Sequence, residues 1–287
     1  MMKKMLCLLL TVMLGLTGSA MAEGAAEEIV HRDVEIVSEN GLTLRGYLEG
    51  PASVLEGDAQ APLIILFHGL MDSGEFELIR AQANAYTAAG YAVLAMDFNG
   101  HGRSDGALID MTISKELQDA EAILAWAEQQ TFASELVVIG HSQGGVVASI
   151  LAARHSQEIG KLVLLAPGGM LADKFRAGTC FGTTFDPADP PEKVMVFDDY
   201  VGRDYIVDTM SMDLYALAEG YRDHSVLLLA GGADPLVAEE VVRRYEVIYS
   251  SPEYVNQVTF EVIPDAPHDF AEHEAELTVA VLSFLQN

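Results

Sequence analysis

Residues 136–147, LVVIGHSQGGVV, decide the fold of this chain. The apolar run Leu136–Ile139 leads into Gly140-His141-Ser142-Gln143-Gly144, and helix-forming residues follow. This is the pattern G-x-S-x-G, in which a strand turns sharply into a helix and exposes a serine hydroxyl at the turn. Glycines flank the serine because a Cβ would clash there. Ser142 is therefore the predicted nucleophile, the alternative being a glycine-rich turn that holds an ordinary serine.

Strand-like apolar runs alternate with helical patterns around this stretch, which is typical of a mostly parallel sheet covered by helices. An opening antiparallel hairpin is expected before the parallel part. The predicted strands are 34–37, 42–48, 63–67, 92–98, 136–140, 162–166, 226–230 and 258–263, and the predicted helices are 76–89, 114–130, 146–154, 235–249 and a last one ending near 285. Residues from about 168 to 224 break the alternation, and we expect them to form a lid insertion, or alternatively a passive surface excursion.

A serine hydroxyl attacks an ester only when a base takes its proton. His268 follows the last predicted strand, where a loop can return it to Ser142, and Asp234 directly follows the strand before it. Asp234 would orient the imidazole, although it could also cap the helix that begins at Pro235; Asp265 is the fallback. The order Ser…Asp…His is that of the α/β-hydrolase fold. We therefore predict that fold, with an eight-stranded sheet and the triad Ser142, Asp234 and His268.

Two backbone N–H groups should stabilise the negative charge that develops on the carbonyl oxygen during attack. We assign them to Gln143, which follows the nucleophile, and to Leu70, in the loop after strand 63–67. The alternative for the second donor is that His68-Gly69 merely ends a strand. No metal or cofactor is expected, because the histidines at the strand ends lack the spacing of metal ligands.

The first residues indicate export from the cytoplasm. Lys3 and Lys4 precede an apolar stretch, Leu6–Leu16, and Ala20-Met21-Ala22 fits a cleavage site, so residues 1–22 read as a secretory signal peptide, with a membrane anchor as the alternative. Residues 23–287 would then form one hydrolase domain, secreted or periplasmic. Cleavage would leave Cys180 as a single cysteine, which we expect to be packed and unreactive.

The charge of the chain excludes some partners. With 16 basic and 43 acidic residues the formal net charge is −27, so the surface should repel nucleic acid, and we expect no stable membrane association. The sequence carries no signal for an oligomeric state.

Two longer stretches resemble the bacterial feruloyl (cinnamoyl) esterases. They are Met96-Asp97-Phe98-Asn99-Gly100-His101-Gly102-Arg103-Ser104-Asp105-Gly106 and Gly140–Ser149, the latter followed by Leu164-Leu165-Ala166-Pro167. The likeness extends over roughly residues 32–285 and includes an insertion of similar length. It implies a serine esterase that acts on hydroxycinnamate esters, with the same triad and oxyanion donors; the triad itself implies an acyl-enzyme. It also implies that Tyr205, in the lid, reaches the phenolic hydroxyl of the substrate.

The sequence departs from that family in the lid. By alignment a family aspartate falls on Lys174 and a family glutamine on Phe181, which should weaken selection for a phenolic hydroxyl. The resemblance still predicts small or plant cell-wall-derived hydroxycinnamate esters as substrates. Because of these departures, short-acyl esters or monoacylglycerols are the alternative. Acyl transfer would use the same residues as hydrolysis. A non-catalytic binding module is the alternative of another class, against which the complete triad argues.

Overall fold

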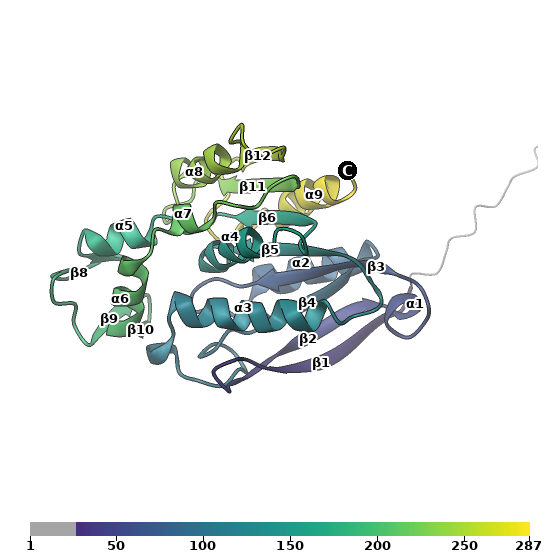
Figure 1. Ribbon diagram of the computed structural model, residues 1–287, viewed down its shortest axis with the longest axis horizontal. Helices are drawn as coiled ribbons and strands as arrows, with labels where there is room; N and C mark the ends of the chain where they lie inside the picture. Colours follow the sequence, from purple (N-terminus) through teal and green to yellow (C-terminus); the bar gives the residue numbers. More distant parts are fainter. Residues whose placement is uncertain (1–26) are drawn as a thin grey trace, which may run out of the picture.

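The computed structural model describes residues 27–287, so the predicted signal peptide lies outside the described residues. An eight-stranded sheet forms the centre, in the order β1-β2-β4-β3-β5-β6-β11-β12 (Figure 1). The strands are β1 (Ile29–Val37), β2 (Thr43–Pro51), β3 (Ala61–Phe67), β4 (Ala92–Met96), β5 (Ala133–His141), β6 (Lys161–Leu165), β11 (Ser225–Gly231) and β12 (Gln257–Ile263). The first two pair antiparallel and the last six run parallel, as predicted.

Strands β3 to β6 and β11 read as continuous apolar runs because helices cover both of their faces. Every residue of β4 and all but one of β3 are buried. The covering helices are α2 (Glu77–Ala88), α3 (Ile113–Ala127), α4 (Gln143–Arg154), α8 (Glu239–Tyr249) and α9 (Glu274–Leu285). Helix α2 contacts α9, and α3 contacts α4, so the sheet lies between two helical layers.

Helix α8 begins four residues later than predicted. The Asp234 carboxylate accepts hydrogen bonds from the backbone N–H groups of Leu236 and Val237, at 2.7 and 2.9 Å. These bonds hold residues 234–237 in a turn of their own, so the helix starts at Glu239. Asp234 therefore stabilises this turn and does not cap a helix, because the residue that precedes α8 is Ala238.

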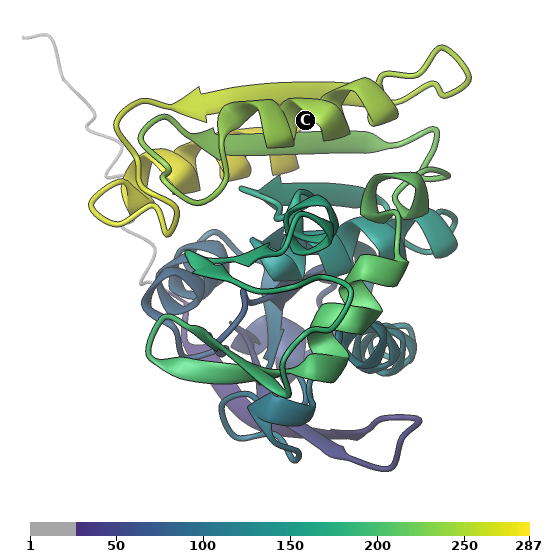
Figure 2. The same ribbon diagram turned by 90° about the vertical axis from the view of Figure 1, so that its left-hand side faces the viewer.

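The segment that breaks the strand–helix alternation projects from the sheet edge at which β5, β11 and β12 end (Figures 1 and 2). It contains α5 (Leu171–Arg176), the hairpin of β7 (Thr179–Cys180) and β8 (Thr183–Thr184), the hairpin of β9 (Lys193–Val196) and β10 (Asp199–Gly202), α6 (Arg203–Ser211) and α7 (Leu214–Leu217). It therefore has secondary structure of its own. Its action as a lid stays a prediction.

The short elements outside this segment are α1 (Ala52–Leu55), after β2, and a single 3-10 turn, Leu108–Asp110, before α3. Within residues 27–287 no helix is both long enough and apolar enough to cross a membrane.

Candidate active site

Ser142 lies at the tight turn between β5 and α4. Its φ of 54° is in the left-handed region, which costs free energy for a residue with a Cβ and is typical of functional positions. Steric crowding explains why glycines flank the serine. A Cβ on Gly144 would lie 2.3 Å from the carbonyl oxygen of His68, and one on Gly140 would lie 2.3 Å from the carbonyl oxygen of Gly144. The close packing of β3, β5 and α4 thus fixes the serine at the end of the sheet.

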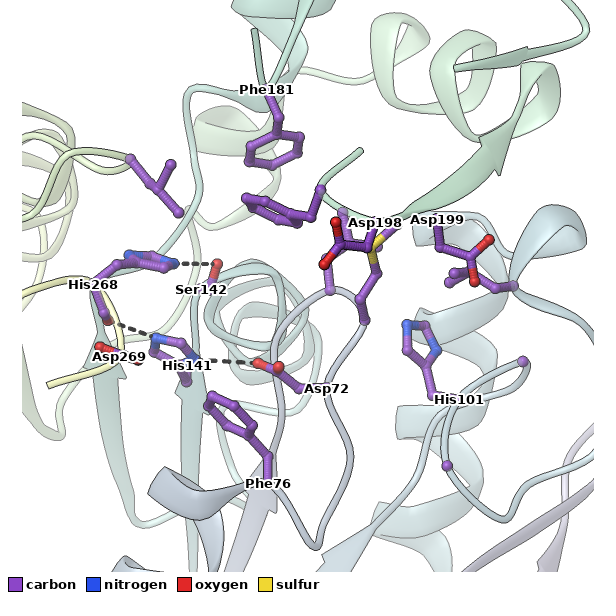
Figure 3. A pocket seen from close by; sticks show the side chains of 17 residues that line it. Asp72, Phe76, His101, His141, Ser142, Phe181, Asp198, Asp199, His268 and Asp269 are labelled. Atoms are coloured by element: carbon purple, nitrogen blue, oxygen red, sulfur yellow. Dashed lines mark hydrogen bonds and ion pairs between the residues drawn. The ribbon is translucent and has the colours of Figure 1, made fainter. Parts of the chain in front are cut away.

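The three residues predicted as a triad lie together. Nε2 of His268 is 2.9 Å from Oγ of Ser142, and Nδ1 of His268 is 2.7 Å from Oδ2 of Asp234 (the first contact is drawn in Figure 3). They come from the ends of β5, β11 and β12, strands whose carboxyl ends share one edge of the sheet. A carboxylate only accepts, so Nδ1 donates to Asp234 and leaves Nε2 free to take the serine proton.

The side chain of Asp234 is completely buried, yet it remains acidic. Burial raises its pKa, but the hydrogen bond and charge of His268, together with two backbone N–H donors, outweigh burial and leave the pKa below its usual value. A buried carboxylate that stays ionised can stabilise an imidazolium beside it.

The predicted oxyanion donors are the N–H groups of Leu70 and Gln143. Neither donates a hydrogen bond to any acceptor within the described part of the chain. Gln143 is the first residue of α4, where N–H groups lack intrahelical partners and the helix dipole favours negative charge. Leu70 lines the same cavity as Ser142. Both N–H groups are therefore without an acceptor among the described residues, as donors to an oxyanion would have to be.

Two residues near the triad were not predicted. Nε2 of His141 donates to the carbonyl oxygen of His268 at 2.9 Å and thereby holds the loop that carries His268. Burial lowers the pKa of His141 to about 3, so its ring is neutral. Asp72 lies 3.9 Å from Nδ1 of His141, and burial raises its pKa to about 6 (Figure 3). His141 precedes the nucleophile in sequence, and that position is the signal that could have singled it out.

A cavity of about 560 Å³ opens beside Ser142 and His268. The inserted segment contributes Phe181 and Phe197, whose rings pack 5.2 Å apart, and two carboxylates, Asp198 and Asp199 (Figure 3). With Asp72 and Asp269 the lining has four aspartates, and no lysine or arginine of the described residues joins them. The cavity thus combines an aromatic wall with negative charge.

The structure corrects the prediction for Tyr205. This residue does not line the cavity; it is fully buried on the inner face of α6, and its hydroxyl donates to Oε1 of Gln143 at 2.5 Å. A side chain sealed in this way does not reach a substrate hydroxyl. Of the two departures from the family pattern, Phe181 lines the cavity, whereas Lys174 is exposed on α5 and does not. Within residues 27–287 no group of three or more metal-binding side chains gathers.

Known proteins resemble this chain in both sequence and structure. Residues 58–185 match the family described as serine aminopeptidase, S33. The structure of Est1E from Butyrivibrio proteoclasticus with ferulic acid bound superposes with a TM-score of 0.81 and 27% identity, covering 88% of this chain and 98% of that one.

The curated relatives match over shorter stretches. A monoacylglycerol lipase of Mycolicibacterium smegmatis is 30% identical over 107 residues, 37% of each chain. An uncharacterised 31.7 kDa protein of Escherichia coli is 38% identical over 77 residues, 27% of each chain. The alignments thus span less than two fifths of the length of these relatives.

Proposed function

We propose that this chain, which has the α/β-hydrolase fold and is similar in structure to Est1E, is a serine carboxylic-ester hydrolase. The observation that carries the proposal is the hydrogen-bonded chain Ser142–His268–Asp234 beside two unpaired backbone N–H groups of the described residues. A non-catalytic module would have no need of a strained serine held 2.9 Å from a histidine.

In the proposed mechanism, Oγ of Ser142 attacks the ester carbonyl carbon while Nε2 of His268 takes the hydroxyl proton. The carbonyl oxygen becomes an oxyanion between the N–H groups of Leu70 and Gln143, and Asp234 stabilises the imidazolium. The tetrahedral intermediate expels the alcohol, which receives the proton from His268, and leaves an acyl-enzyme. Water, deprotonated by His268, then attacks the acyl group, and the second tetrahedral intermediate releases the acid and regenerates Ser142.

We propose hydroxycinnamate esters, including those derived from plant cell walls, as the substrates. Two observations support this choice: the aromatic wall of Phe181 and Phe197 suits a flat acyl group, and Est1E, similar over most of both chains, binds ferulic acid. The four aspartates of the lining favour esters without a negative charge. Monoacylglycerols are the second candidate, supported by the similarity to the mycobacterial lipase.

We further propose that the enzyme acts outside the cytoplasm after removal of residues 1–22. The support is the sequence pattern of Lys3, Lys4 and the apolar stretch that follows them. N-terminal sequencing of the protein recovered from a bacterial host tests this. Cleavage after Ala22 predicts a mature chain that begins at Glu23, whereas a chain that still begins at Met1 would contradict the proposal.

The test of the function measures acid release from methyl ferulate and from a monoacylglycerol, with nitrophenyl acetate as a general ester. Ser142→Ala is the matched control, because it removes only the nucleophilic oxygen. Ferulate release that disappears in the variant supports the full proposal. Cleavage of nitrophenyl acetate alone retains the esterase and rejects the substrate class, and failure of the wild type to react with a fluorophosphonate probe rejects the serine hydrolase itself.

A further inference from the structure

The side chain of Gln143 is held in a buried hydrogen-bond network behind the proposed oxyanion site. Its Nε2 donates to Oε2 of Glu116 at 2.8 Å, and its Oε1 accepts from the hydroxyl of Tyr205 at 2.5 Å. All three side chains are at most 1% exposed. Polar groups buried to this extent are costly unless paired, so each bond constrains the position of the amide.

The two partners hold the amide at both of its polar atoms. Glu116 accepts from the nitrogen, whereas Tyr205 donates to the oxygen, so moving the side chain would break both bonds. The backbone N–H of the same residue is the predicted oxyanion donor. A fixed side chain therefore limits rotation of the residue that carries this donor, on the first turn of α4.

The partners come from elements outside the catalytic turn. Glu116 lies on α3, whereas Tyr205 lies on α6 of the inserted segment. A second contact joins these elements: Asp208, also on α6, accepts from the backbone N–H and the hydroxyl of Ser114 at 2.9 and 2.6 Å. In Figure 2 the inserted segment, which includes α6, faces the viewer. The insertion is thus connected to the oxyanion donor through Gln143.

We propose that Tyr205 and Glu116 are positioning residues, which hold the side chain of Gln143 and thereby aim its backbone N–H at the oxyanion. This inference rests on the proposed esterase function. It assigns to the tyrosine of the inserted segment a role in stabilising the transition state in place of substrate contact. The insertion then contributes to the rate of the chemical step as well as to the walls of the cavity.

The test is a double-mutant cycle between Tyr205→Phe and Gln143→Met. The first removes one hydroxyl and leaves the ring in place, and the second removes the hydrogen bonds of the amide but retains the backbone N–H. Tyr221→Phe is the matched control, since Tyr221 is also fully buried and donates to one backbone carbonyl, that of Ile159, at 3.1 Å. Nitrophenyl acetate is the substrate, and a boronic acid, which becomes tetrahedral on Ser142, is the inhibitor.

We expect Tyr205→Phe to lower kcat about tenfold, less than the roughly 100- to 1,000-fold effect of losing an oxyanion donor, with KM unchanged within about twofold. The affinity for the boronic acid should fall in parallel. In the Gln143→Met background the same substitution should have no further effect, because the group through which Tyr205 acts is already gone.

Two results would overturn the inference: a kcat for Tyr205→Phe equal to that of Tyr221→Phe, or a loss that persists undiminished in the Gln143→Met background. If Tyr205→Phe does not fold, Glu116→Leu takes its place in the cycle, with the same expectations. An inactive wild type would instead refute the esterase proposal, so the two failures are distinguishable.

Discussion

Glu116 is a carboxylic acid buried on α3 without a cationic partner among the residues 27–287. Burial raises its pKa to about 8, and the nearby Asp119 and Asp208 act in the same direction, against the hydrogen bond from Gln143. Glu116→Gln replaces it with a neutral side chain of the same shape that still offers an oxygen to Gln143. We expect this substitution to stabilise the protein, and to do so more strongly as the pH rises.

The direction of this pH dependence follows from the number of protons that the folded and unfolded states bind. Between the ordinary pKa of 4.5 and about 8, the folded state keeps the proton of Glu116 while the unfolded state releases it. The wild type therefore loses about 1.4 kcal/mol of its free energy of unfolding per pH unit in this interval, and glutamine does not. From about pH 5.5 to about pH 7.5 the advantage of the variant should grow by about 3 kcal/mol, or roughly 6–10 °C in Tm.

Urea unfolding at the two pH values measures this difference directly. Glu128→Gln, at the exposed end of the same helix, is the control for removing one negative charge from an acidic protein. Its advantage should stay within about 0.5 kcal/mol at both pH values. An advantage of Glu116→Gln that does not change with pH, or that shrinks as the pH rises, would mean that Glu116 is ionised in the folded protein and would refute the reasoning.

Four further predictions concern the cavity and the packing. With an ester that carries a carboxylate, KM should rise as the pH passes about 6, because Asp72 then ionises, and Asp72→Asn should abolish that rise; an equal rise in the variant would exclude Asp72 as the cause. Phe181→Ala should raise KM for methyl ferulate, an ester of an aromatic acid, roughly tenfold and change KM for nitrophenyl acetate, whose acyl group is small, by no more than about twofold; equal changes for the two esters would show that this ring does not bind the acyl group. Gly144→Ala should lower Tm sharply because its Cβ would lie 2.3 Å from a backbone oxygen, whereas Gly168→Ala, with 3.4 Å to its nearest neighbour, should not. Cys180 is buried and its pKa is raised to about 12 by burial, so iodoacetamide should modify it in denaturant but not in the native protein, as mass spectrometry would show.

The fold and the triad could be predicted because Ser142, Asp234 and His268 each lie within a few residues of the end of a predicted strand. In a parallel sheet, the residues that follow the strands meet at one edge, so positions 142, 234 and 268 converge although they are far apart in sequence. The eight-stranded, mostly parallel sheet is confirmed by the structure. The predicted start of α8 was wrong. The Asp234 carboxylate accepts a hydrogen bond from the backbone N–H of Val237, and this bond competes with helix formation.

The direction in which the Tyr205 side chain points could not be predicted from its position in the inserted segment. The buried residues of α6 are Tyr205, Ile206 and Thr209, a spacing that forms one face of a helix, and this pattern was the available signal. Glu116 was overlooked because an acid within a helix is ordinarily exposed. Its partner Gln143 lies far away in sequence, and no local pattern joins the two.

The base of the proposed triad lies shortly after β12, which is the edge strand of the sheet and, among the described strands, pairs only with β11. During synthesis or refolding, the turn that holds Ser142 can form from earlier strands, but His268 reaches it only after this edge strand has docked. Appearance of ester hydrolysis would therefore report the docking of β12, which helix formation monitored by circular dichroism would not distinguish. A chain that ends before β12 would contain a nucleophile without its base, and it would remain inert however well its remainder folded.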